Sequence, residues 1–153
     1  MQAFRLNPQQ TTVQAQELLD NGIFYERLSD DPPLRRDQID KIKATHGYVD
    51  EDVVELNLAT PDLDTICKKF DKEHFHTDDE VRLVLSGAGI FDIRDLDDQW
   101  IRIEVHHGDL LIVPANRNHR FMLTDSKQIA CLRLFKDKEG WSPIYRTLAT
   151  AAT

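Results

Sequence analysis

The sequence predicts a mainly β (α+β) protein in which helices come first and an antiparallel β-barrel or sandwich follows. In residues 63–70 the apolar side chains lie three and four positions apart, which is the spacing of one helix face. From residue 81 onward, apolar and polar side chains alternate, as they do in half-buried strands. Short alternating stretches that are separated by turn residues are typical of antiparallel barrels and sandwiches.

The part of the chain up to about residue 72 is expected to be helical. A short first helix ends at Gly22, where a left-handed residue suits a helix end. A second helix begins at Asp30–Pro33, because aspartate caps free backbone amides and proline has the φ of a helix start. This helix ends at Gly47. Residues 52–58 fit either a helix or a strand, and the helix over residues 63–70 follows.

The barrel is expected from about residue 73 to residue 146. Gly-containing turns at residues 87–89 and 106–109 separate the alternating stretches. Because the chain shows no repeat, no low-complexity tract and no linker, we expect one domain over residues 1–153. The strands are predicted at residues 81–85, 91–93, 101–105, 110–113, 121–123 and 129–135.

Charge and composition count against several classes of partner. The 19 Lys and Arg residues against 27 Asp and Glu residues give a net charge of −8, whereas nucleic acids and anionic membranes attract basic proteins. No apolar run approaches the roughly 20 residues of a membrane helix, and the N-terminus lacks the apolar core of a signal peptide. Cys67 and Cys131 are too few for a disulfide scaffold. We expect a cytoplasmic monomer that binds a small molecule, with no nucleic-acid or membrane partner.

The segment His74–Glu80, HFHTDDE, is the most informative in the chain. Side chains two apart on a strand face the same way, so His74 and His76 can present two imidazoles to one point. Glu80 follows after a turn that can bring a carboxylate to the same point. Two imidazoles and a carboxylate form a ligand set for iron(II), nickel, manganese or zinc. For the two histidines alone, the alternative of solvated residues in a polar turn stays open.

The spacing of these residues resembles the two halves of the cupin metal motif. The first half is H-x-H-x3-E-x6-G, which ends at Gly87, and the second is G-x5-P-x4-H, which runs from Gly108 to His119. This resemblance implies a cupin-type antiparallel barrel, or jelly roll, with the N-terminal helices packed on it. It implies four metal ligands: His74, His76, Glu80 and His119.

Two positions depart from the usual cupin pattern. Asn116 stands where cupins usually have glycine, and asparagine tolerates a left-handed backbone better than most residues. Lys68 stands where the first motif usually opens with glycine. Because Lys68 falls in a predicted helix, we expect the chain to enter the barrel differently from a standard cupin.

Within the cupins, the chain resembles the acireductone dioxygenase family. The resemblance rests on EHFHTDDEVRLVLSGAGIFDIRD, DQWIRIEVHHGDLLIVP, NHRF, LRLF and a following GW, which together extend from about Phe70 to Arg146. It implies a metal-dependent dioxygenase that cleaves acireductone (1,2-dihydroxy-3-keto-5-methylthiopentene) with O2 in methionine salvage, with one Fe(2+) or Ni(2+) per chain. Iron is expected to give 2-keto-4-methylthiobutyrate and formate. Nickel is expected to give 3-methylthiopropionate, formate and CO.

Two arginines are candidates for binding an anion in this site. Arg82 follows Glu80 by two positions, and Arg133 interrupts the apolar run 129–135. A buried guanidinium needs a negative partner, which is either a ligand or an internal Asp or Glu. The family resemblance implies that Arg82 and Arg133 bind and orient the substrate oxygens as catalytic residues. Arg102 and Arg120 are expected to be solvated.

The resemblance also implies a substrate pocket walled by Phe70, Phe121 and Trp141. The alternative for these aromatic residues is ordinary core packing, since aromatic side chains dominate cores generally. Asp78 and Asp79 are expected to form a solvated turn.

Two other functions remain open at this stage. The chain could be another cupin dioxygenase that acts on a small acid, or a non-catalytic metal-binding cupin that senses a small ligand. O2 uptake with acireductone separates an acireductone dioxygenase from the binding protein.

Overall fold

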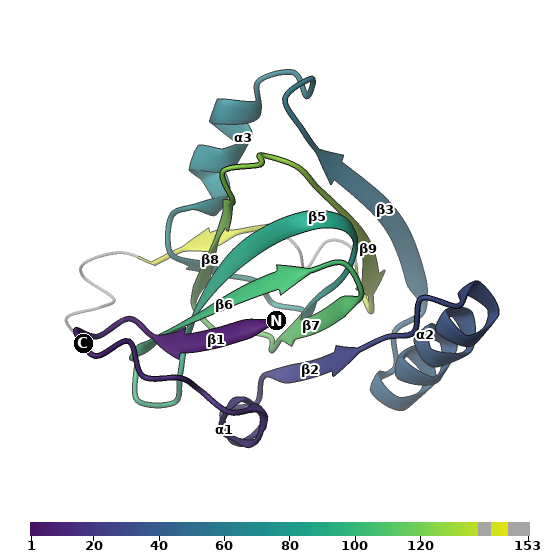
Figure 1. The fold of residues 1–153 in the computed structure, drawn as a ribbon, viewed down its shortest axis with the longest axis horizontal. Helices are drawn as coiled ribbons and strands as arrows, with labels where there is room; N and C mark the ends of the chain where they lie inside the picture. The colour runs from purple at the N-terminus through teal and green to yellow at the C-terminus, as the bar shows by residue number, and fades with distance from the viewer. Residues whose placement is uncertain (138–141, 147–153) are drawn as a thin grey trace.

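The computed structural model describes residues 1–137 and 142–146, and the fold is mainly antiparallel β-structure (Figure 1). The elements in chain order are β1 (Gln2–Arg5), α1 (Ala15–Asp20), β2 (Phe24–Arg27), α2 (Pro32–His46), β3 (Asp50–Leu56), α3 (Leu63–Phe70), β4 (His74–Phe75), β5 (Glu80–Arg94), β6 (Trp100–His106), β7 (Asp109–Val113), β8 (His119–Leu123), β9 (Ile129–Phe135) and β10 (Ile144–Tyr145).

The long strand β5 belongs to both sides of the barrel. Its second half pairs with β6 and β8, in the order β1-β6-β5-β8-β4-β10. Its first half pairs with β7 and β9, to which β2 and β3 add the outer strands. A register shift between Val84 and Ser86 marks the change. Gly87 follows with φ of 76°, and a Cβ there would lie 2.1 Å from the Gln128 carbonyl oxygen. The bend therefore requires glycine.

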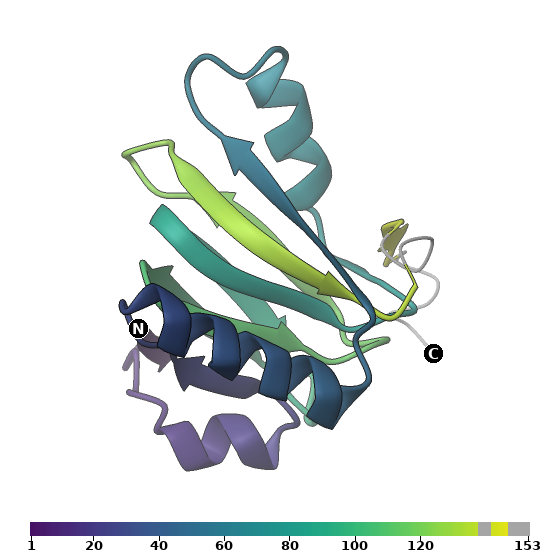
Figure 2. The same cartoon turned by 90° about the vertical axis from the view of Figure 1, so that its right-hand side faces the viewer.

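The helices surround the barrel rather than fill it (Figure 2). Helix α2 packs Ile39 and Ile42 against a buried cluster that includes Val81 and Leu110 of the barrel. Helix α3 lies at the opposite end of the molecule from α1 and packs beside β8. Within the described residues, no helix has the length and apolar character needed to cross a membrane. The mainly antiparallel barrel with helices packed on it is thus confirmed.

The expectation that the first 72 residues are helical is only partly correct. All three helices form there, and Gly47 ends α2 with φ of 80°. However, β1, β2 and β3 also lie in this part of the chain, where they pair with β6, β7 and β9. The ambiguous residues 52–58 belong mostly to β3. Because β1 and β2 are four residues long, they are too short to show a period, and their pairing with distant strands determines their conformation.

Candidate metal centre

Three buried histidines converge inside the barrel. His74 on β4 stands directly opposite His119 on β8, and His76 follows β4 by one residue. One nitrogen from each of the three rings lies within 4.8 Å of the others. All three side chains are at least 96% buried. The structure therefore brings together the three histidines that the spacing of the two motifs selects.

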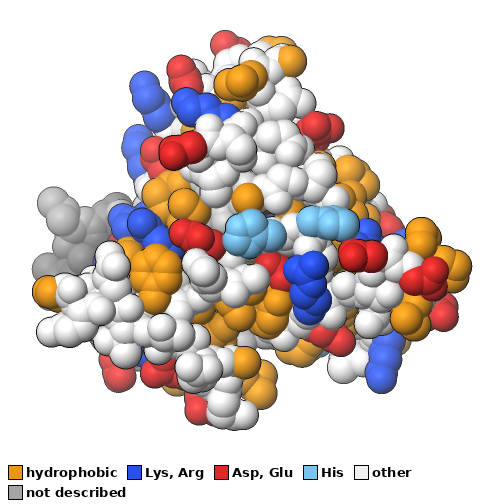
Figure 3. Space-filling model, viewed as in Figure 1, with side chains coloured by type: hydrophobic (Ala, Val, Ile, Leu, Met, Phe, Trp, Pro, Cys, Tyr) orange, Lys and Arg blue, Asp and Glu red, His pale blue; other side chains and the backbone are white. Residues whose placement is uncertain are grey.

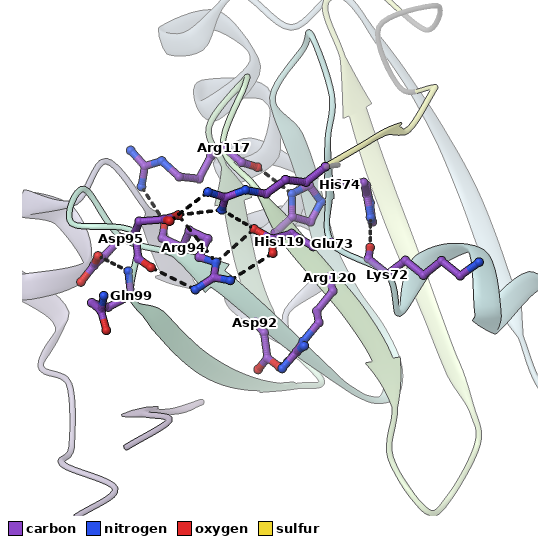
Figure 4. Close-up of polar contacts among 12 residues, drawn as sticks. Lys72, Glu73, His74, Asp92, Arg94, Asp95, Gln99, Arg117, His119 and Arg120 are labelled. Carbon is purple, nitrogen blue, oxygen red and sulfur yellow. Dashed lines mark hydrogen bonds and ion pairs between the residues drawn. The ribbon is translucent and has the colours of Figure 1, made fainter. Parts of the chain in front are cut away.

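Backbone carbonyl groups orient two of the imidazoles (Figure 4). His74 Nδ1 lies 2.6 Å from the Lys72 carbonyl oxygen, and His119 Nδ1 lies 2.9 Å from the Arg117 carbonyl oxygen. A carbonyl oxygen only accepts, so each Nδ1 carries the proton and donates. The lone pair of each neutral ring is therefore on Nε2, as a metal ligand requires.

Glu80, at the start of β5, faces the histidines. Its Oε2 lies 2.6 Å from His119 Nε2 and 3.9 Å from His76 Nε2. Glu80 Oε2 and His119 Nε2 are both buried, and neither has a hydrogen-bond partner among the described residues. With the imidazole proton on Nδ1, both of these atoms are acceptors, so their close approach fits two neighbouring ligands of one cation. The other carboxylate oxygen of Glu80 accepts from Arg82 Nη2 at 2.9 Å.

The electrostatics keep these groups in the protonation state of metal ligands. Burial disfavours the imidazolium ion, and with the neighbouring His119 it lowers the pKa of His74 to about 4. Burial also lowers the pKa of His76. For Glu80, burial opposes ionisation, but the charge of Arg82 and the nearby His119 outweigh it and hold the pKa of the carboxyl group well below its ordinary value. At neutral pH the centre therefore offers neutral imidazoles at His74 and His76 and a carboxylate at Glu80.

An ion-pair network supports the strand that carries His74 (Figure 4). Glu73 accepts from Arg94 Nε and Nη2, both at 3.0 Å, and from Arg146 Nη1 at 2.7 Å. Arg146 also donates to both carboxylate oxygens of Asp98, at 2.8 and 2.9 Å. Arg146 immediately follows β10, which pairs with β4 on the side away from β8. The network therefore fastens β10 against the short metal-site strand.

Asp78 and Asp79 are hydrogen-bonded anchors, so the expectation of a solvated turn is wrong. Asp78 Oδ2 accepts from the backbone amides of residues 136 and 137, each at 3.0 Å. Asp79 accepts from the Tyr48 hydroxyl at 2.8 Å and from the Ala115 amide at 2.9 Å. The two carboxylates hold the loop between the metal-site strands against three distant segments. Their partners lie too far away in the sequence for a local pattern to reveal them.

A largely apolar cavity of about 370 Å³ is lined by residues that contact the metal centre, although the three histidines themselves do not line it. Arg82, Arg133, Phe70 and Phe121 line it, and Arg82 links it to the metal centre through Glu80. Phe70 also contacts the His74 ring, with 6.5 Å between ring centroids. Four of the five side chains expected around a substrate thus share one cavity. The fifth, Trp141, lies outside the described residues.

The two cavity arginines already have internal carboxylate partners. Arg82 is paired with Glu80, as described above. Arg133 on β9 stands opposite Asp52 on β3 and donates to both of its oxygens, at 2.8 and 2.7 Å. Of the two partners that the sequence allows for Arg133, a bound ligand or an internal carboxylate, the structure shows the internal carboxylate of Asp52. The charge of this residue alone does not require a bound anion.

Arg102 and Arg120 are not simply solvated, contrary to expectation. Both donate to Asp92, a fully buried carboxylate on the central strand β5. The Nε atom of Arg102 lies 2.7 Å from Asp92 Oδ1, and that of Arg120 lies 2.8 Å from Asp92 Oδ2. Asp92 pairs in register with both residues, so the three side chains form a row across β6, β5 and β8. This row fixes the neighbouring strand β8, which carries His119.

One face of the molecule carries side chains of both charges. On the face shown in Figure 3, acidic and basic side chains are interspersed over the barrel and the helices. Two further histidines are exposed outside the metal centre: His106 is the last residue of β6, and His107 follows it in the turn to β7.

Comparisons with known proteins agree on one family. A model described as "ARD/ARD' family" matches residues 3–143. The chain is 46% identical over 134 residues to the acireductone dioxygenase of Heterostelium pallidum, which covers 88% of this chain and 90% of that protein. It is 36% identical over 146 residues to the Dictyostelium discoideum acireductone dioxygenase, with 95% and 99% covered.

A solved structure shows the same fold. The acireductone dioxygenase from Bacillus anthracis, which has a cadmium ion in its active centre, aligns with a TM-score of 0.85 at 34% sequence identity. The alignment covers 95% of this chain and 98% of that one.

Proposed function

The chain belongs to the ARD/ARD′ family of acireductone dioxygenases, and we propose that it cleaves acireductone with O2 as a step of methionine salvage. The observation that carries the proposal is the buried group of three histidines, which faces Glu80 and adjoins a cavity lined by arginine and aromatic side chains. Family membership supports the reaction type, and the geometry supports its location in the chain.

We assign His74, His76, Glu80 and His119 as ligands of one Fe(2+) or Ni(2+) per chain. The facing Glu80 Oε2 and His119 Nε2 atoms support this assignment, because both are buried without a hydrogen-bond partner among the described residues. Imidazole and carboxylate ligands suit both metals. A bound ion of this kind supplies Lewis acidity, and thereby holds and stabilises the negative charge of an enediolate substrate.

Arg82 is assigned to bind and orient the substrate. Its guanidinium donates to Glu80 and also lines the cavity, so it lies between the proposed ligand and the space that an anion would enter. A fixed positive charge at this point compensates part of the substrate charge and selects one orientation of its oxygens. Arg133 is assigned the same function further from the metal ligands, where Asp52 holds its side chain in place.

The apolar wall of the cavity is assigned to the methylthio tail of the substrate. Phe70 and Phe121 line this wall, and contacts between sulfur and aromatic rings contribute roughly 0.3–1.5 kcal/mol. The family resemblance gives Trp141 the same function. No protein nucleophile is required, because an electron-rich enediolate is itself the reductant of O2.

The products are proposed to depend on the metal. With iron they are 2-keto-4-methylthiobutyrate and formate, and with nickel they are 3-methylthiopropionate, formate and CO. The protein ligands are the same in both cases. The two outcomes must therefore follow from differences between the ions in preferred geometry and redox behaviour.

O2 consumption with synthetic acireductone tests the enzymatic proposal. Metal-reconstituted protein is expected to consume O2 well above the uncatalysed rate. His76→Ala is expected to lose both metal and activity, and to melt at a lower temperature when metal is present, because a ligand of the native state stabilises it. His107→Ala is the matched control, since this histidine is exposed and outside the centre. If the reconstituted protein binds metal and acireductone without O2 uptake, a binding function replaces the enzymatic one.

A further inference from the structure

One position on the interior side of β5 lacks a side chain. Side chains two apart on a strand face the same way, so Ile93, Phe91 and Gly89 form one interior row. Ile93 and Phe91 are fully buried in the core. The row is interrupted at Gly89, where only hydrogen projects toward the barrel interior.

Two cavity-lining side chains occupy the space that Gly89 leaves. A Cβ atom at Gly89 would lie 2.6 Å from Phe121 Cε2 and 2.9 Å from Ile129 Cδ1, distances that real Cβ atoms essentially never show. Both Phe121 and Ile129 line the cavity beside the metal centre. The backbone at Gly89 does not adopt the left-handed conformation of Gly87, so its φ does not require glycine. Glycine is required because the neighbouring side chains fill the space that a Cβ atom would take.

The Phe121 ring packs against β5 on one side and borders two open spaces, the cavity described above and a smaller one of about 210 Å³ beside α3. Phe121 stands directly opposite Phe91, and the two ring centroids are 5.0 Å apart. Phe91 is itself fully buried. A methyl group at Gly89 would therefore displace both the Phe121 ring and the Ile129 side chain away from β5, and the cavity that both residues line is the space open to Ile129. The cavity would become shorter at this end.

Gly89 lies further along the strand pair β5–β8 than the metal ligand His119: Ile93 pairs with His119, whereas Gly89 pairs with Leu123, four residues further on. Phe121 lies two residues beyond His119 on the same face of β8, which is about 7 Å along an extended strand. A ligand whose polar end is held at the histidines would extend its tail past Phe121 toward Gly89 and Ile129. The position of the Phe121 ring therefore determines how long that tail can be.

We propose that Gly89 is a specificity-determining residue. Because it has no side chain, Phe121 and Ile129 can pack against the backbone of β5, and their position determines the length of the apolar tail that the cavity accepts. The inference rests on the proposed function for the identity of the natural ligand. The geometric relation between Gly89 and the cavity wall does not depend on that identity.

The primary experiment measures the binding of a ligand series that does not react. Straight-chain carboxylates from propanoate to heptanoate are titrated into nickel-loaded wild-type and Gly89→Ala protein by calorimetry. Wild-type affinity is expected to rise with each added methylene until the tail reaches the cavity end. In Gly89→Ala the rise should stop at a shorter chain, with an affinity at least about tenfold lower for the longest acid that wild type binds well, since one methylene in an apolar pocket changes selectivity roughly 10- to 200-fold.

Three further variants make the experiment decisive. Ile129→Ala enlarges the same end and should extend the rise to longer chains. Phe121→Leu combined with Gly89→Ala removes the ring atoms closest to the new methyl group but leaves Ile129 in place, and should restore part of the lost affinity for the longer chains. Ala3→Val is the control for overpacking, because Ala3 is buried in the same core but does not line the cavity. It should leave the length dependence unchanged.

The proposal is overturned if Gly89→Ala lowers the affinity of all chain lengths by the same factor, or changes none. If Gly89→Ala does not fold, the test passes to Ile129→Ala, and an unchanged length dependence there overturns the proposal equally. Failure of the dioxygenase proposal has a different signature: wild-type protein consumes no O2 with acireductone, while the carboxylate series still shows the effect of Gly89.

Discussion

Removing the Arg146 side chain is expected to weaken metal retention more than it weakens the fold. Strand β4, which carries His74, is only two residues long and is held between β8 and β10. Arg146 fastens β10 through one bond to Glu73 at 2.7 Å and two bonds to Asp98 at 2.8 and 2.9 Å. In Arg146→Ala, β10 should separate from β4 more often, and His74 should then lose its fixed position.

The size of the effect follows from the exposure of the partners. Asp98 is 56% exposed, and an exposed ion pair contributes at most about 1 kcal/mol. Glu73 is only 18% exposed, so its charged hydrogen bond contributes more, but Arg94 still neutralises it after the substitution. Together, the contacts of Arg146 with Asp98 and Glu73 are expected to stabilise the docking of β10 by about 1–2 kcal/mol. If β10 docking is fully coupled to metal binding, the metal Kd should rise roughly 5- to 30-fold.

Competition with a chelator measures this change directly. Nickel-loaded wild type, Arg146→Ala and Arg146→Lys are titrated with chelator, and Arg36→Ala serves as the matched control. Arg36 makes a similar two-carboxylate contact with Asp40 and Glu51 on the surface of α2 and β3. Arg146→Lys should recover part of the affinity. If Arg146→Ala and Arg36→Ala retain metal equally well, β10 does not support His74 and the reasoning is wrong.

Two other predictions concern single charged side chains. Arg82→Ala should lower turnover with acireductone at least about tenfold. Elemental analysis should show that the metal content stays near one ion per chain. If turnover and metal content fall equally, Arg82 acts structurally, through its contact with Glu80. Hydrogen bonds from Arg36 lower the pKa of Glu51 to about 2 from its ordinary 4.5. Burial acts in the opposite direction, and a hydrogen bond from Lys43 lowers the pKa further. Because this folded-state pKa is depressed, the stabilisation is complete above about pH 4.5 and is lost as the pH falls toward 2. Glu51→Gln should therefore reduce the free energy of unfolding at pH 7 by about 1 kcal/mol after solvent screening. In urea unfolding, the difference in the free energy of unfolding between wild type and Glu51→Gln should become smaller as the pH falls from 4.5 to 2. A difference that stays constant over this range would contradict the assignment.

The parts of the site that sequence predicts are those encoded by short spacings. His74 and His76 lie two positions apart, at and just after the short strand β4, and the motif interval selects His119 although it is 43 residues beyond His76. The left-handed backbone expected at Asn116 is present, with φ of 64°. Lys68 lies in α3, which confirms that a helix leads into the metal-site strand.

The parts that sequence did not predict depend on pairing between distant strands. Asp52 and Arg133 are 81 positions apart and meet only because β3 and β9 align in that register. Asp92 and Arg120 are 28 positions apart and meet across β5 and β8. Neither register follows from a local pattern of apolar residues. For this reason the sequence alone does not reveal the carboxylate partners of Arg102, Arg120 and Arg133.

Product analysis after reconstitution with each metal tests the central claim most directly. Apoprotein is loaded separately with iron(II) and nickel(II), supplied with acireductone and O2, and assayed for formate and carbon monoxide. We expect O2 consumption and formate with both metals, and carbon monoxide mainly with nickel. If neither metal supports O2 uptake above the uncatalysed background, the protein is not an acireductone dioxygenase.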